Sequence, residues 1–163
     1  MRKGISAAAG VSVALLLLAG CSPTETPPVT DEPGTVTEGA ELAVATSDLG
    51  EIVVDGEGMT VYVFDNDTQG TDKSACEDAC AALWPAVITE SDAPTVEGVT
   101  GTVGTIEAIE GGQQVTLNGW PLYTYADDSG PGDVAGQAFN DVWWVVDPSG
   151  EKITDMPDSG FSY

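Results

Sequence analysis

Two stretches decide how this chain is built: VYVFDND at residues 61–67 and LYTYADD at residues 122–128. Each has a tyrosine, a second aromatic residue two positions later, and an aspartate three positions after that. The phrases align without gaps at an offset of 61 residues, and each copy then reaches a tryptophan, Trp84 or Trp143. Such self-similarity indicates an internal repeat. The matched positions are Tyr62 with Tyr123, Phe64 with Tyr125, and Asp67 with Asp128.

The repeated unit is predicted to be a β-hairpin. Runs rich in β-branched and aromatic residues alternate with turn signals such as Asn118-Gly119, which tolerates the positive φ of a tight turn. Because a lone hairpin is only marginally stable, we expect the two units to share one core. This predicts a mainly β fold (β-rich α+β) with one short helix in the first copy. The expected strands are 51–55, 60–65, 105–110, 113–117, 121–125 and 142–147.

The single helix is expected at about residues 74–83. Ser74 and Glu77 have the spacing of a capping box, in which the serine bonds a free backbone N–H and the glutamate reaches back. Several alanines follow, and Trp84-Pro85 would end the helix.

Cys76 and Cys80 would lie one turn apart on one face of that helix, within reach of a disulfide. A structural disulfide is one interpretation, since cysteine pairs outside the cytoplasm usually oxidise. A redox-active or metal-binding pair is the alternative. Glu77 and Asp78 between the thiols would disfavour the reactive thiolate.

The chain begins with residues typical of a secretory leader. Arg2 and Lys3 precede an apolar run, residues 5–18, that is short for a membrane span. The run ends in Leu18-Ala19-Gly20-Cys21, which resembles the lipobox of bacterial lipoproteins. By that resemblance residues 1–20 are a signal peptide, and Cys21 carries the lipid that anchors the chain outside the membrane. An ordinary signal peptide or a single span is the alternative.

The composition divides the remaining chain into three parts. Residues 21–43 are rich in Pro, Thr and Glu and poor in large apolar side chains, so we predict a disordered tether. The first repeat unit is expected at residues 44–100 and the second at residues 101–163.

Charge and composition exclude several function classes. Loss of the leader would leave 27 acidic residues against Lys73 and Lys152, a formal net charge of −25. Such a chain is repelled by nucleic acid and by anionic lipid surfaces. The sequence contains no histidine, which excludes Ser–His–Asp and Cys–His catalysis and His-ligated metals. We expect no enzyme activity, no cofactor and no resident metal.

The chain resembles a known family. The two tyrosine phrases, the lipobox, the CxxxC followed by Trp84-Pro85, and GPGDVAGQAFNDVWWVVDPSG at residues 130–150 are together similar to bacterial lipoproteins described as a secreted repeat of unknown function, with a Yx(F/W/Y)xxD motif. The resemblance covers about residues 46–152. It implies two tandem copies on a secreted lipoprotein. It carries no settled activity over to this chain. Trp144 departs from it, because a smaller or more polar aromatic residue is usual there.

The aromatic residues of the motif allow two interpretations. Tyr62 and Phe64 face one side of their strand, so they are either core residues, with each tyrosine hydroxyl bonded to the aspartate of its own copy, or part of a groove for a sugar or peptide. Trp143 and Trp144 face opposite sides of a strand, which leaves one of them as a candidate exposed contact. The possible ligand-binding set is Tyr62, Phe64, Asp67, Trp84, Tyr123, Tyr125, Asp128, Trp143 and Trp144.

A cation site is a weaker possibility. The spacing of Asp65, Asp67 and Gln69-Gly70 matches the first half of an EF-hand loop, but Cys76 stands where the bidentate glutamate is required. A different site could use Asp65, Asp67 and Asp72, with Asp127, Asp128 and Asp133 as their equivalents in the second copy.

These observations lead to one preferred function and one alternative. The preferred function is a membrane-anchored extracytoplasmic module that binds an unknown envelope protein or small ligand without catalysis. The alternative is an extracytoplasmic redox or metal-handling protein that uses Cys76 and Cys80.

Overall fold

The computed structural model describes residues 39–156. The expected signal peptide, Cys21 and the tether up to residue 38 lie outside the described residues. In chain order the elements are β1 (Leu42–Ser47), β2 (Gly50–Asp55), β3 (Tyr62–Phe64), α1 (Ala79–Leu83), β4 (Ile88–Thr89), β5 (Val103–Glu107), β6 (Gln113–Leu117), β7 (Trp120–Pro121), the 3-10 helix η1 (Phe139–Asp141) and β8 (Trp143–Val145).

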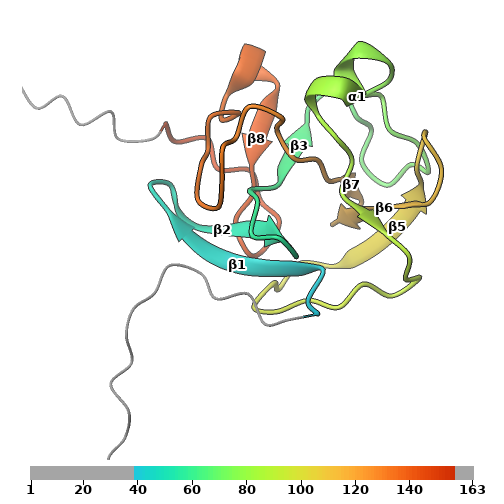
Figure 1. Ribbon diagram of the computed structural model, residues 1–163, viewed down its shortest axis with the longest axis horizontal. Coiled ribbons are helices and arrows are strands. Elements are labelled where there is room, and N and C mark those ends of the chain that lie inside the picture. Colours follow the sequence, from blue (N-terminus) through green and yellow to red (C-terminus); the bar gives the residue numbers. More distant parts are fainter. Residues whose placement is uncertain (1–38, 157–163) are drawn as a thin grey trace, which may run out of the picture. The chain divides into compact units, whose positions relative to one another are not determined.

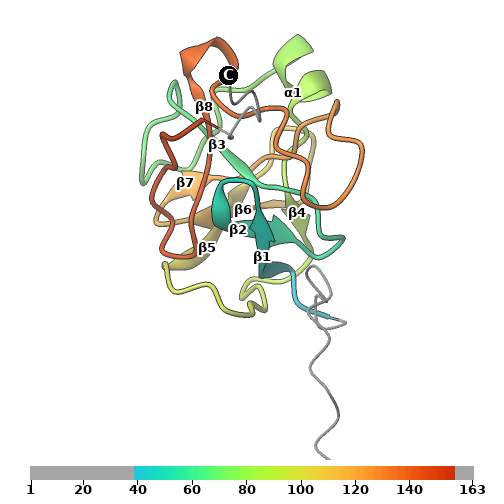
Figure 2. The same cartoon turned by 90° about the vertical axis from the view of Figure 1, so that its left-hand side faces the viewer.

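The strands form small antiparallel sheets, as the sequence predicts. β1 and β2 make one hairpin, and β6 is flanked by β4 and β5 and pairs at its end with β7 (Figure 1). The turn between β6 and β7 is Asn118-Gly119, with φ values of 51° and 80°. Both residues therefore occupy the left-handed region that a two-residue hairpin turn requires. Toward the opposite end from β1 lie α1 and β8 (Figure 2).

Backbone pairings around the two motifs join the two copies of the repeat. β3 carries the motif of the first copy and pairs with β8 of the second copy. The motif of the second copy pairs in turn with the first: the Thr124 amide donates to the Pro85 carbonyl at 2.9 Å, and the Ala126 amide donates to the Leu83 carbonyl at 2.9 Å. Each motif strand therefore lies against the tryptophan segment of the other copy, so the two repeats are interlocked.

Two groups of buried side chains fill the core. One is mainly aromatic and gathers around the motif residues, whereas the other is aliphatic and lies under β6. The aromatic group contains Tyr62, Phe64, Trp84, Tyr123, Tyr125 and Trp143, with Ala43, Ile52, Val54, Cys76 and Val145. The aliphatic group contains Leu42, Val53, Val61, Val63, Val87, Val115, Leu117, Leu122 and Val146.

The fold begins earlier than the composition indicates. Residues 39–43 were assigned to the tether, but Leu42 starts β1 and both Leu42 and Ala43 are buried. Glu41 bonds the hydroxyl of Thr89 and accepts the Thr95 amide at 2.9 Å. The expected end of the tether at residue 43 is therefore wrong, because these few apolar residues gain a partner strand that composition does not reveal.

The helix is shorter than predicted. α1 spans Ala79–Leu83, and its N-cap is Asp78, which has φ 53° and makes no capping side-chain bond. The expected capping box at Ser74 does not form. The Ser74 hydroxyl oxygen accepts the Cys76 amide at 3.0 Å and lies 2.6 Å from the hydroxyl oxygen of Tyr123. The serine therefore still accepts a nearby backbone amide, but this bond lies before the start of α1 at Ala79 and does not cap it.

Strand boundaries differ where turns intervene. The strand at 113–117 is confirmed, whereas the one expected at 105–110 runs from Val103 to Glu107 because a turn starts at Ala108. The stretch 121–125 is strand only at its start, and Tyr123 then pairs through isolated bridges. Within the described residues, no helix is long and apolar enough to cross a membrane.

The interlocked pairing predicts that neither repeat folds alone. We expect fragments 39–100 and 101–156 to be separately unfolded at low concentration, because each has lost the partner of its motif strand. An equimolar mixture should regain the dispersed amide NMR spectrum of the intact domain. A dispersed spectrum from either fragment as a monomer would contradict the interlocking.

Candidate functional site

The two copies of the motif meet at their tyrosines. The Tyr62 amide donates to the Tyr123 carbonyl at 2.8 Å, and the Tyr123 amide donates to the Tyr62 carbonyl at 3.0 Å. Both side chains are almost completely buried, at 0% and 1% exposure. Equivalent residues of the two repeats therefore form one hydrogen-bonded pair at the centre of the domain.

Each tyrosine hydroxyl bonds the aspartate of the other copy. The Tyr62 hydroxyl donates to Oδ2 of Asp128 at 2.8 Å, and the Tyr123 hydroxyl donates to Oδ2 of Asp67 at 2.7 Å. The prediction of bonds within each copy is therefore wrong. Sequence separation favours the nearer aspartate, but the interlocked strands carry each tyrosine toward the farther one.

The remaining oxygen of each aspartate holds a loop in place. Asp67 Oδ1 accepts the Ala75 amide at 2.6 Å, and Asp128 Oδ1 accepts the Ala135 amide at 2.9 Å. Burial raises the pKa of both carboxyl groups above the ordinary value, and these hydrogen bonds partly oppose the rise. Burial and the neighbouring aspartate also raise the pKa of each tyrosine. The motif's polar atoms thus brace the core.

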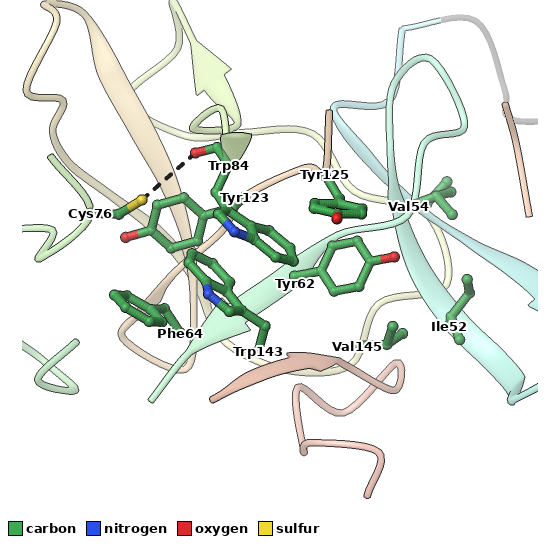
Figure 3. Packing of buried hydrophobic residues seen from close by; sticks show 11 residues of the cluster. Ile52, Val54, Tyr62, Phe64, Cys76, Trp84, Tyr123, Tyr125, Trp143 and Val145 are labelled. Atoms are coloured by element: carbon green, nitrogen blue, oxygen red, sulfur yellow. Dashed lines mark hydrogen bonds between the residues drawn. The ribbon is translucent and has the colours of Figure 1, made fainter. Parts of the chain in front are cut away.

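The other aromatic residues stack between the two copies (Figure 3). Trp84 and Trp143 lie face to face, with ring centroids 3.8 Å apart and planes 3° apart. Phe64 stacks on the outer face of Trp143 at 4.1 Å, and Tyr125 packs on Trp84 at 4.3 Å. Every contact in this four-ring stack crosses from one copy to the other. Each such pair contributes about 0.5–1.5 kcal/mol beyond the area it buries.

Tight packing around the stack explains why residue 136 is a glycine. A Cβ atom on Gly136 would lie 2.7 Å from Trp84 and 3.0 Å from Tyr62. The Gly136 amide donates to the Tyr62 hydroxyl oxygen at 3.3 Å. A side chain here would therefore displace both the tryptophan and the tyrosine.

Trp143 and Trp144 face opposite sides of β8, as predicted. Trp143 is buried in the stack, whereas Trp144 is half-buried and not freely exposed. Its indole N–H donates to Oδ2 of Asp65 at 2.9 Å. Asp65 also pairs with Lys152, whose ammonium lies 4.7 Å from the ring centroid of Trp120. The side of β8 that carries Trp144 is therefore occupied by a polar network around Asp65 and Lys152.

The aspartates considered for a cation site bond different partners within the protein. Asp67 and Asp128 are bound in the core, and Asp133 Oδ2 accepts the Ser129 amide at 2.8 Å. Asp127 accepts the Tyr125 hydroxyl at 3.2 Å. Among residues 39–156, no three Asp, Glu or Cys side chains gather as metal ligands.

Cys76 and Cys80 form a disulfide, with their Cα atoms 5.1 Å apart. The predicted bond is confirmed, although Cys76 precedes α1 and does not lie on it. Cys76 is buried against the aromatic cluster, whereas Cys80 is half-buried. The redox role for this pair stays a prediction.

A cavity of about 250 Å³ opens beside the disulfide. Its inner wall is formed by Cys76, Trp84 and Tyr123, and Ala81 of α1 closes one side. The turn from Ala108 to Gly111, between β5 and β6, closes the other side. The cavity thus lies on the outer side of the motif residues.

Two isoleucines stand at this cavity. Ile88 of β4 and Ile109 of the turn are each 50% exposed, and both line this cavity, so they are not scattered single residues. Two polar side chains of the lining are bonded within the protein: Gln114 donates to the Leu122 carbonyl at 2.9 Å, and Ser74 bonds Tyr123. An apolar guest would therefore leave these hydrogen bonds intact.

Sequence reasoning found part of this cavity. It singled out Trp84, Tyr123 and Cys76, but it missed Ala81, Ile88 and Ile109. The alanine falls on the predicted helix and Ile109 falls on the strand expected at 105–110, whereas Ile88 lies outside every expected element. Only their joint exposure in the folded chain marks them, and no local pattern carries that signal.

A family model described as a secreted repeat of unknown function matches the chain twice, at residues 43–88 and at residues 104–147. The two matches correspond to the two interlocked copies. No curated protein and no solved structure matches the chain.

Removal of one buried hydroxyl tests the crossed bonds. We expect Tyr62→Phe to lower the free energy of unfolding by about 2 kcal/mol, because a buried carboxylate loses a donor. Tyr125→Phe is the matched control, since its hydroxyl contacts only the exposed Asp127, and it should cost much less. Urea denaturation measures both.

A double-mutant cycle then separates the crossed pairing from the pairing within a copy. Tyr62→Phe should couple strongly to Asp128→Asn and weakly to Asp67→Asn, because coupling energy is largest for groups in direct contact. The opposite ranking would show that the tyrosine bonds the aspartate of its own copy.

Proposed function

This chain belongs to the family of secreted repeats of unknown function, and we propose that it is a lipid-anchored extracytoplasmic module that binds a small apolar ligand without transforming it. The family description places the chain among secreted proteins. The lipid anchor, the binding and the lack of catalysis are the parts that we propose.

One observation carries the binding role: an apolar cavity stands open between Ile88 and Ile109. Ligand sites are typically concave and lined by apolar and aromatic side chains with few polar groups. The volume of about 250 Å³ suits a fragment or a single aromatic group and is too small for a drug-sized molecule. An engineered cavity of about 150 Å³ in another protein already admits benzene.

The inner wall of the cavity also supports binding over catalysis. Tyr123 reaches the wall, but its hydroxyl proton is donated to Asp67, and burial and this aspartate raise its pKa. Ser74 is bonded to the same hydroxyl. Both groups are thus committed to holding the core. A rigid wall of this kind suits a site that selects its guest by shape.

The anchor is supported by the sequence alone. Leu18-Ala19-Gly20-Cys21 resembles a lipobox, and a diacylated cysteine would hold the chain stably, whereas a single acyl chain gives only marginal binding. The tether that follows would keep the acidic domain away from an anionic surface.

The anchor is tested by labelling. We expect the full chain, expressed in a bacterium with lipoprotein processing, to incorporate radiolabelled palmitate and to sediment with membranes. Cys21→Ser should lose the label, while Cys76→Ser/Cys80→Ser should keep it. Palmitate label on the Cys21→Ser chain would contradict a lipid anchor at this residue.

The binding role is tested with a neutral aromatic probe, 2-phenylethanol. In NMR titrations of the secreted Cys21→Ser chain, residues 21–163, we expect saturable shifts at Ala81, Ile88 and Ile109. Ala81→Leu should abolish them, because the larger side chain enters the cavity. Ala82→Leu, exposed on the same helix and outside the cavity lining, should leave binding unchanged. Absence of saturable shifts would reject the proposed site.

A further inference from the structure

Acidic side chains surround the apolar cavity. A shallower hollow shares Ala108 and Ile109 with it, and a second hollow shares Ala86 and Ile88. Both hollows, and the cavity lining itself, carry carboxylates. These are Asp72, Glu77 and Glu107 in the first hollow, Glu41, Asp55 and Glu57 in the second, and Glu110 in the cavity lining.

Few positive charges offset these carboxylates. Lys73, in the first hollow, is the one basic residue that lines the cavity or either hollow. Lys152, the other lysine of residues 39–156, is paired with Asp65. Because carboxylates of one sign beside low-dielectric walls focus their field, the local potential at the cavity is strongly negative.

We propose that this cavity selects a small organic cation, with an apolar or aromatic group inside the cavity and an amine held among the surrounding carboxylates. The inference rests on the proposed binding function and deepens it by naming the ligand class. Charge complementarity argues for this occupant, since an anionic or zwitterionic guest would bring its own carboxylate toward Glu107 and Glu110.

The size of the cavity agrees with the same class. About 250 Å³ accepts one aromatic ring with a short linker, which leaves the amine at the opening. Trp84 and Tyr123 on the inner wall offer aromatic surface to a ring. A ring that fits there thus carries its charged end toward the carboxylates.

The experiment compares three probes that share a phenylethyl group and differ in charge. These are 2-phenylethylammonium, 2-phenylethanol and 3-phenylpropionate, titrated by NMR into the secreted Cys21→Ser chain, residues 21–163. At low ionic strength we expect the ammonium probe to bind about tenfold more tightly than the alcohol, with the carboxylate weakest. The preference should shrink in about 0.5 M salt, where exposed charges are screened.

A matched pair of variants locates the effect. Glu107→Gln/Glu110→Gln should reduce the preference for the ammonium probe several-fold and leave 2-phenylethanol unchanged. Glu51→Gln/Glu151→Gln removes the same number of carboxylates from exposed positions outside the cavity and both hollows, and should keep the preference. If both variants lost the preference for the ammonium probe equally, net charge alone would explain that preference, and the proposed cation site would be overturned.

The outcomes separate the two proposals. If the alcohol binds as tightly as the ammonium probe, the cation selectivity is overturned while the binding function stands. If no probe binds, both proposals fall.

A peptide amide with adjacent Phe and Lys is a fourth probe. If it binds and 2-phenylethylammonium does not, the occupant is a protein partner and the proposal of a small cation is overturned.

Discussion

The fold depends on the exchange of hydrogen bonds between Tyr62 and Tyr123 and the aspartates of the opposite copies. The backbones of the two tyrosines bond each other, and their hydroxyls reach Asp128 and Asp67. A buried carboxylate is costly unless it is well bonded, so each aspartate accepts two donors. These four groups fix the register in which the two repeats meet. The stacked tryptophans then fill the space that this register creates.

The same arrangement accounts for the position of the candidate site. In the first copy the chain between Asp67 and Trp84 carries the disulfide and α1, and this segment leaves a cavity against Tyr123. In the second copy the corresponding chain, between Asp128 and Trp143, contains the 3-10 helix and no cysteine. The core is nearly symmetric while the loops that cover it are not. A cavity bordered by asymmetric loops can acquire its own specificity without disturbing the shared core.

Much of the architecture could be predicted from the sequence, because it depends on local patterns. The repeat, the β-rich class, the strand at 113–117, the Asn118-Gly119 turn and the disulfide all follow from spacing and turn chemistry. The crossing of the copies could not be predicted in this way. Tyr62 lies at the same separation from Asp67 as Tyr123 does from Asp128, so sequence separation favours pairing within a copy, and only the interlocked strands bring each tyrosine to the aspartate of the other copy.

The helix cap was predicted wrongly and the cavity was not predicted, for a related reason. Ser74 has the local pattern of a cap, but its hydroxyl lies 2.6 Å from that of Tyr123, which is far away in sequence. Ile88 lies outside every expected element and Ile109 on an expected strand, until the fold leaves both half exposed at one cavity. The fold starts the helix at Ala79, beyond the local bond of Ser74, and it creates the cavity where no local signal exists.

The crossed bonds also constrain how such a gene can change. A substitution at Tyr62 alters the surroundings of Asp128 in the other repeat, so the two halves cannot diverge independently, although a duplication normally frees one copy to drift. Compensating changes should fall in opposite copies.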